Sequence, residues 1–217
     1  MNYIENIYLC IAAPLLAAIV SLKGKHRKMM IFLLSGMTSC LLSSYITTFL
    51  SVRLHAEAYQ TAWEVAPMIE ELMKLLPVLF YLMVFEPASR ADTSWCMIHV
   101  AVGFATFENI CWLTANGASH ILLILIRGFG TGAMHVVCGA MISAGLMYMW
   151  KDMWLRIAGT IGILTLAFTY HGIYNILVSQ DGAVAWIGYI IPMVTTVLVI
   201  LIRNRIYNVR NSAQIAP

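Results

Sequence analysis

The sequence contains little charge: only 11% of its 217 residues are Asp, Glu, Lys or Arg, whereas 61% are hydrophobic. Soluble domains carry about 25% charged and about 45–50% apolar residues. A soluble fold of this length could not hide so much apolar surface, because much of any folded surface faces solvent. The scarcity of charge therefore excludes a soluble globular domain and predicts a protein that lies mostly in lipid.

The chain also lacks paired cysteine motifs. Its five cysteines show no C-x-x-C spacing, and all of them fall within apolar runs. In such positions cysteine is typical of small buried hydrophobic residues, which argues against a disulfide framework or a cysteine zinc site. The net charge of +3 comes from short basic blocks between apolar runs, so it does not indicate a nucleic-acid partner.

Seven apolar runs are long enough to cross a membrane, since a helix needs about 20 mostly apolar residues for a hydrocarbon core of about 30 Å. Strand-like alternation is absent, so we predict an all-α, polytopic membrane protein with a bundle of about seven transmembrane helices. The fifth run exceeds one crossing, and we expect its start to be tilted, broken or interfacial around Gly128, Gly130 and Gly132. The four-residue spacing of Gly128 and Gly132 also favours close helix packing. The predicted spans are Ile4–Leu22, Met29–Val52, Val65–Phe85, Trp95–Ala115, Ile121–Trp150, Trp154–Val178 and Val184–Ile202.

The connections between these runs are short, so residues 1–217 are predicted to form a single transmembrane domain. Ten Lys and Arg residues fall on one side of the predicted topology and Arg53 alone on the other. By the positive-inside rule, this imbalance places the N-terminus outside and the C-terminus in the cytoplasm. The ten residues are Lys23, Lys25, Arg27, Lys28, Arg90, Lys151, Arg156, Arg203, Arg205 and Arg210.

Ionisable side chains inside the spans are few, and each needs a reason because a charge at the bilayer centre costs at least about 2.5–3.5 kcal/mol. Counting at about 1.5 Å per residue puts three carboxylates and two imidazoles about 8–12 Å below the outer surface. They come from four different spans, so their convergence on one layer predicts a site. The five residues are Glu70, Glu71, Glu108, His135 and His171.

Helical spacing places further side chains near this layer. Lys74 follows Glu70 by four residues, which favours an ion pair on one helix face. The same spacing lets the amide of an asparagine point into the cavity beside His171, and puts an aromatic wall beside Glu108. The supporting residues are Lys74, Phe104, Asn109, Arg127 and Asn175.

Three carboxylates and two imidazoles permit two ways of hydrolysing an amide. In the first, without a metal, a carboxylate takes a proton from the attacking water while His and Asn side chains stabilise the oxyanion. In the second, Glu108, His135 and His171 bind zinc, and Glu70 or Glu71 acts as the base. We favour no cofactor, because H-E-x-x-H is absent and the zinc ligands would come from three helices.

Four short motifs carry a resemblance to a known family. The first two are Glu70-Glu71-Leu-Met-Lys74, which looks like E-E-x-x-K, and Phe104-Ala-Thr-Phe-Glu108-Asn109, which looks like F-x-x-x-E-N. The others are Arg127 followed by His135-x-x-x-Gly139, and His171-Gly-Ile-Tyr-Asn175. Together they resemble the motifs of the PrsW intramembrane proteases, relatives of the type II CAAX prenyl proteases and bacteriocin-processing enzymes. The motif-bearing core spans residues 65–178.

The resemblance implies a multi-pass, glutamate-dependent endopeptidase of the bacterial cell membrane. Its expected partners are the lipid bilayer and a single-pass membrane protein substrate, such as an anti-sigma factor, which it would cut at site 1 near the outer face in a stress response. The resemblance also implies catalytic roles for Glu70, Glu71, Glu108 and His171, with His135 close by. It leaves metal dependence open.

Other interpretations stay open on the sequence. A non-enzymatic scaffold or small transporter would use the polar cluster for packing, with Glu70–Lys74 and Glu108–Arg127 as structural ion pairs. The inner halves of the spans contain no second row of acids, and no internal repeat is evident, which argues against a transporter. A prenyl-peptide processing enzyme would need a cavity facing the cytoplasm, which the charge count disfavours.

Overall fold

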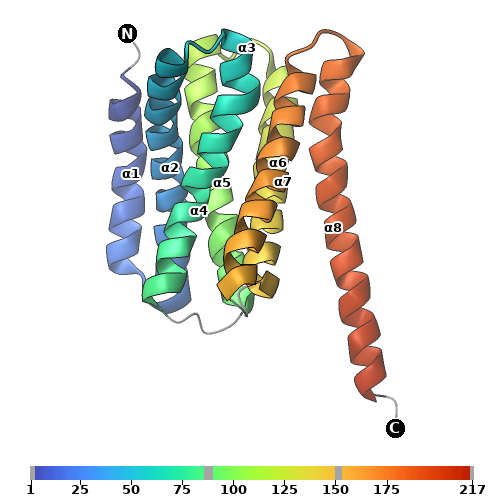
Figure 1. The fold of residues 1–217 in the computed structure, drawn as a ribbon. Helices are drawn as coiled ribbons and strands as arrows, with labels where there is room; N and C mark the ends of the chain where they lie inside the picture. The colour runs from blue at the N-terminus through green and yellow to red at the C-terminus, as the bar shows by residue number, and fades with distance from the viewer. Residues whose placement is uncertain (1–2, 86–89, 150–152, 216–217) are drawn as a thin grey trace.

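The computed structural model describes residues 3–85, 90–149 and 153–215, and within them every regular element is helical. The long helices alternate in direction along the bundle (Figure 1). One end, drawn at the top of Figure 1 and named the upper end here, holds the start of α1, α4, α6 and α8 and the end of α2, α5 and α7. The helices are α1 (Ile4–Ser21), α2 (Gly24–Leu54), α3 (Ala58–Gln60), the π-helix η1 (Thr61–Val65), α4 (Ala66–Val84), α5 (Arg90–Asn116), α6 (Ile121–Met149), α7 (Met153–Val178) and α8 (Ala183–Ile215).

The helices confirm an all-α polytopic membrane protein. Among the described residues, six helices are long and apolar enough to span a membrane: α1, α2, α5, α6, α7 and α8. The remaining predicted span is α4, which has 19 residues and therefore sufficient length. It carries Glu70, Glu71 and Lys74, which are more charges than a simple apolar span tolerates. Thus α4 is the polar member of the bundle.

The fifth predicted span forms one uninterrupted helix, α6, of 29 residues. Of the three alternatives expected for its start, the break around the glycines is therefore wrong. A broken helix in hydrocarbon would leave backbone N–H and C=O groups without partners, a cost that outweighs the weak helix preference of glycine. The predicted end of this span at Trp150 lies outside the described residues.

Close helix packing occurs between α2 and α5, at glycines that the sequence reading did not single out. A Cβ atom at Gly36 would lie 2.0 Å from the Val100 carbonyl oxygen, and one at Gly103 would lie 2.0 Å from the Leu33 carbonyl oxygen. At Gly128 and Gly132, by contrast, a Cβ atom would meet no atom of the described residues within 4 Å. The close approach expected at that pair is therefore wrong, and it occurs between α2 and α5 instead.

This packing gives a first testable prediction. Replacement of Gly36 by alanine is expected to lower the free energy of unfolding by about 1–3 kcal/mol or more, because the obstructing atoms are backbone and cannot rotate away. Thermal unfolding of the purified protein in detergent measures the change. The matched control is Gly132→Ala, which should leave the melting temperature equal or slightly higher, since alanine favours a helix over glycine. Equal melting temperatures for the two variants would contradict the prediction.

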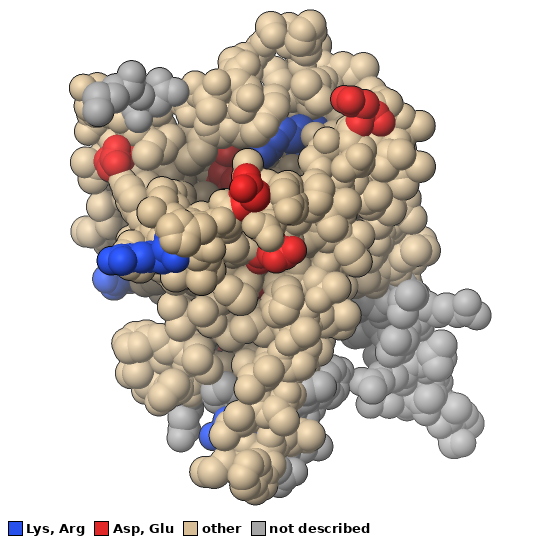
Figure 2. Space-filling view, turned by 45° about the horizontal axis from the view of Figure 1, so that its top comes forward, with Lys and Arg blue, Asp and Glu red and all other residues tan. Residues whose placement is uncertain are grey.

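Charge of opposite sign gathers at the two ends of the bundle. Figure 2, which brings the upper end forward, shows acidic side chains over this face and both acidic and basic side chains in a hollow. At the upper end lie Glu5, Arg53, Glu57, Glu64 and Asp181, and at the lower end lie Lys23, Lys25, Arg27, Lys28 and Arg156. Lys151 lies outside the described residues, as do the side chains of Arg90, Arg203, Arg205 and Arg210. The N-outside orientation stays a prediction.

Candidate active site

The four helices α4, α5, α6 and α7 bring the five predicted site residues together in the upper half of the bundle. Partners far apart in the sequence make direct contact: His171 Nδ1 lies 2.8 Å from Glu71 Oε1, across 100 positions. The polar cluster, as we name it, consists of Glu70, Glu71 and Lys74 on α4, Glu108 on α5, His135 on α6 and His171 on α7.

At the centre of the cluster, Glu71 and Lys74 form an ion pair with both side chains fully buried. Lys74 Nζ donates to Glu71 Oε1 at 2.6 Å, and the same oxygen accepts from His171 Nδ1. The expected pairing of Lys74 with Glu70 is wrong. The two glutamates lie on opposite sides of Lys74 around the helix, about 40° and about 60° away, and the ammonium group turns to Glu71, the fully buried one. Lys74 therefore neutralises Glu71, and Glu71 fixes the ring of His171.

His135 connects this ion pair to the next carboxylate. Its Nδ1 lies 2.8 Å from Lys74 Nζ, and its Nε2 contacts Glu108 Oε2. An ammonium group can donate hydrogen bonds but cannot accept them. Nδ1 therefore accepts from Lys74, and Nε2–H donates to Glu108. The Phe104 ring lies 4.7 Å from Lys74 Nζ and 5.0 Å from the His135 ring centre. Phe104 thus forms an aromatic wall of the site. Its ring packs against Lys74 and His135, whereas the sequence predicted a wall beside Glu108.

Glu108 is the most accessible carboxylate of the cluster. Its side chain is 27% exposed, compared with 17% for Glu70 and 0% for Glu71. Arg127 Nη2 donates to Glu108 Oε1 at 3.2 Å, and Arg127 Nη1 donates to Asn109 Oδ1. The Glu108–Arg127 pair expected from the sequence is therefore present. It leaves Glu108 held in place and partly exposed.

Asn175 does not join the polar cluster, although it shares the last motif with His171. Its Nδ2 donates to the Ala62 carbonyl oxygen of η1 at 2.9 Å. One turn away, Gly172 lets η1 approach α7, since a Cβ atom there would lie 2.6 Å from the Trp63 carbonyl oxygen. Asn175 and Gly172 therefore hold the π-helix at α7, and the amide does not point at the carboxylates as expected.

Three residues of the cluster could hold a metal ion: Glu70, His135 and His171 each place a ligand atom within 4.8 Å of the other two. Glu70 Oε2 is buried, has no hydrogen-bond partner in the described structure, and lies 3.7 Å from His171 Nε2. Leaving a carboxylate oxygen buried and unpaired is costly, and a bound cation would remove that cost.

The second partners of the histidines also fit a metal site. The hydrogen bond from His171 Nδ1 to Glu71 leaves Nε2 free to face Glu70, which is the usual carboxylate–histidine–metal arrangement. His135 would bind a metal as the neutral imidazole, through one ring nitrogen. That nitrogen would exchange its present contact, with Lys74 or with Glu108, for the metal. One carboxylate and two imidazoles suit zinc. This candidate ligand set differs from the zinc alternative predicted from the sequence, since it contains Glu70 in place of Glu108.

A model of the PrsW family, described as intramembrane metalloproteases, matches residues 25–202. This range covers most of the chain and contains every residue of the polar cluster. No solved structure matches the chain. The family description and the donor set both favour the zinc alternative over the absence of a cofactor. The chain therefore belongs to the PrsW family of intramembrane metalloproteases.

Proposed function

We propose that this intramembrane protease cuts a single-pass membrane protein near the membrane face at the upper end of the bundle, as in site-1 cleavage of an anti-sigma factor. Its family makes the protein a membrane peptidase, and the six long apolar helices among the described residues make it multi-pass. The observation that carries the proposal is the polar cluster, built from four helices in the upper half. With the N-terminus outside, this face is the outer face of the bacterial membrane.

Within the cluster, Glu70, His135 and His171 would hold the metal. Bound zinc supplies a Lewis acid for the scissile carbonyl and makes a coordinated water more acidic. Glu108 lies beside this ligand set and is the most accessible carboxylate, so it is placed to take the proton of the attacking water and return it to the leaving amine. Arg127 holds the other carboxylate oxygen and so fixes the direction of Glu108.

Glu71 and Lys74 have a positioning role in this proposal. Both are fully buried, so neither reaches a substrate directly. Glu71 orients His171 through Nδ1, and Lys74 supplies the positive charge that lets Glu71 stay ionised away from water.

Metal content tests the ligand set. The purified full-length protein is expected to hold about one zinc ion per chain, measured by inductively coupled plasma mass spectrometry. Glu70→Gln and His171→Ala should each lower the zinc content of a dilute sample by at least about tenfold, because each removes one of three ligands. The matched control is Glu64→Gln, an exposed carboxylate on η1 that should keep wild-type zinc. Wild-type zinc in Glu70→Gln would contradict the proposed ligand set.

Cleavage itself is tested by profiling new protein N-termini in membranes of cells that express the wild type or Glu108→Gln. The proposal expects peptides that occur only with the wild type and that map just outside a single transmembrane segment. Glu64→Gln serves again as the control and should give the wild-type peptides. New N-termini that map to the cytoplasmic side would overturn the proposed orientation, and equal profiles for wild type and Glu108→Gln would overturn the proposed mechanism.

A further inference from the structure

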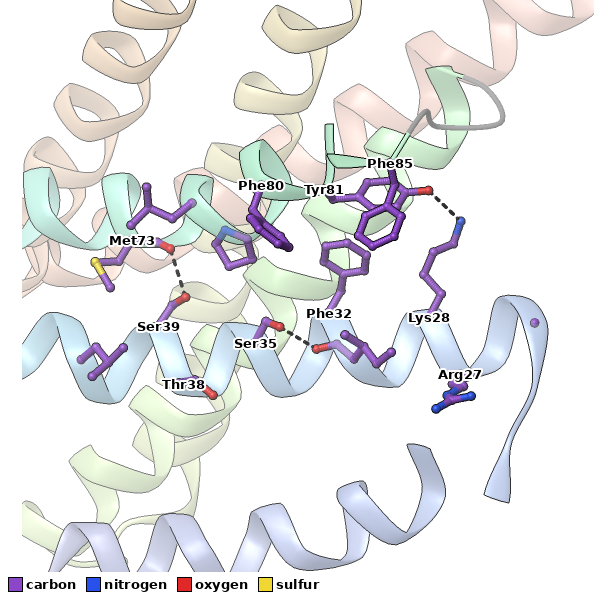
Figure 3. A pocket seen from close by; sticks show the side chains of 15 residues that line it. Arg27, Lys28, Phe32, Ser35, Thr38, Ser39, Met73, Phe80, Tyr81 and Phe85 are labelled. Atoms are coloured by element: carbon purple, nitrogen blue, oxygen red, sulfur yellow. Dashed lines mark hydrogen bonds between the residues drawn. The ribbon is translucent and has the colours of Figure 1, made fainter. Parts of the chain in front are cut away.

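A groove of about 740 Å³ runs along α2 and α4 in the lower half of the bundle, on the opposite side of α4 from the buried ion pair. Figure 3 shows Arg27 and Lys28 at one end of it and Ser39 and Met73 at the other. Phe80 of α4 and Phe85, the residue that follows this helix, border the groove and are more than half exposed. It therefore opens toward the surroundings of the bundle, which in a membrane are lipid.

The interior of the groove offers no free hydrogen-bond donor from its serines. Ser35 Oγ donates to the Ile31 carbonyl oxygen at 2.8 Å, and Ser39 Oγ donates to the Met73 carbonyl oxygen at 3.0 Å. The remaining walls include Phe32, Leu76, Pro77 and Phe80. An occupant of this part gains only apolar contact, so a hydrocarbon chain fits it.

The lower end of the groove is polar and positively charged, because the N-terminus of α2, the positive end of its helix dipole, lies there. Lys23, the residue before the helix, makes no side-chain capping hydrogen bond, and the first turn contains no acidic residue. Basic residues follow at positions 25, 27 and 28. Cations at a helix N-terminus oppose the helix dipole, and the free N–H groups there attract anions. An anion at this end would relieve both unfavourable features.

One cation at this end is available to such an anion. Lys28 lies 2.6 Å from Asp92, and Lys25 lies over the ring of Trp95. Arg27 borders the groove, and in the part of the chain that the structure describes it has no hydrogen bond or ion pair. Gly24, at the start of α2, also borders the groove. The guanidinium group of Arg27 thus lies next to the apolar part of the groove.

We propose that this groove binds an anionic phospholipid, with the phosphate at Arg27 and the start of α2 and an acyl chain along α2 and α4. Basic pockets between helices at the membrane interface select anionic headgroups in this way. A transmembrane segment of the substrate fits less well, because no residue of the polar cluster lines the groove and a peptide bond lying there could not reach Glu108. The proposal is independent of the proteolytic mechanism.

Native mass spectrometry of the full-length protein tests the headgroup. With phosphatidylglycerol and phosphatidylcholine supplied in equal amounts, the wild type should retain one phosphatidylglycerol in preference. Arg27→Gln should weaken the binding of phosphatidylglycerol about fivefold and leave that of phosphatidylcholine unchanged. The matched control is Arg53→Gln, which removes a cation from the other end of α2 and should bind as the wild type does.

A second pair of variants tests the acyl channel without changing charge. Ser35→Phe fills the groove and should abolish retention of the lipid. Ser44→Phe is its control, since Ser44 makes the same kind of hydrogen bond within α2 but does not line the groove. Unchanged melting temperatures check that all four variants fold. Equal retention of the two lipids, wild-type binding by Arg27→Gln, or wild-type binding by Ser35→Phe would overturn the proposal.

Discussion

Replacement of Glu108 by glutamine is expected to slow substrate cleavage by about 10²–10⁴-fold, the usual contribution of a general acid–base group. Glutamine keeps the size of the side chain and an oxygen that can accept from Arg127 or His135, but it cannot take a proton from water. The measurement is the cleavage rate of the full-length protein, reconstituted in liposomes with the substrate that N-terminal profiling identifies.

The zinc content of Glu108→Gln separates two roles for this residue. A base outside the ligand set leaves the zinc content at the wild-type level while activity falls. Loss of zinc together with activity would instead favour Glu108 as a ligand, the zinc alternative from the sequence, and would contradict our assignment of Glu108 as the base. Full activity in the variant would remove Glu108 from the mechanism.

Replacement of Lys74 by methionine should destabilise the protein by about 3–5 kcal/mol, because it leaves a buried carboxylate without its counter-charge. Glu71 is fully buried, so water cannot compensate for the lost ammonium group. Thermal unfolding in detergent measures the loss. The matched control is Lys28→Met, which breaks a partly exposed ion pair with Asp92 and should cost no more than about 1 kcal/mol.

A double variant shows that the cost comes from the unpaired charge. Glu71→Gln combined with Lys74→Met removes both charges at once, so it should be more stable than Lys74→Met alone. If the stability changes of Glu71→Gln and Lys74→Met simply add in the double variant, the two residues act independently, and the ion pair makes no separate contribution to stability. Zinc content in the same samples reports whether His171 keeps its orientation.

The depth of the site could be predicted from the sequence, because rise per residue is nearly constant in every helix. Counting from the ends of alternating spans was enough to place Glu70, Glu108, His135 and His171 in one layer, and the structure brings them together. The Glu108–Arg127 pair, which the non-enzymatic interpretation expected, is also present. What the sequence resolved was position along each helix axis.

The rotation of each helix about its axis could not be predicted, since neighbouring helices determine it. For that reason the sequence paired Lys74 with Glu70, whereas Lys74 turns to Glu71. It also pointed Asn175 into the cluster, whereas the amide holds η1. The close approach of α2 to α5 at Gly36 could not be predicted for the same reason. A glycine is required there only because the backbone of α5 faces it.

The polar character of α4 also affects how the chain is inserted during synthesis. Each of its three charged residues opposes insertion by about 2.5–3.5 kcal/mol at the bilayer centre, so α4 alone is a poor candidate for release into lipid. The partners that accommodate its charges, His135 and His171, follow Lys74 by 61 and Glu71 by 100 residues. A nascent chain that ends before α7 therefore lacks His171, one of the partners of the charges on α4. The polar cluster is therefore complete only after α7 has been synthesised and has packed against α4.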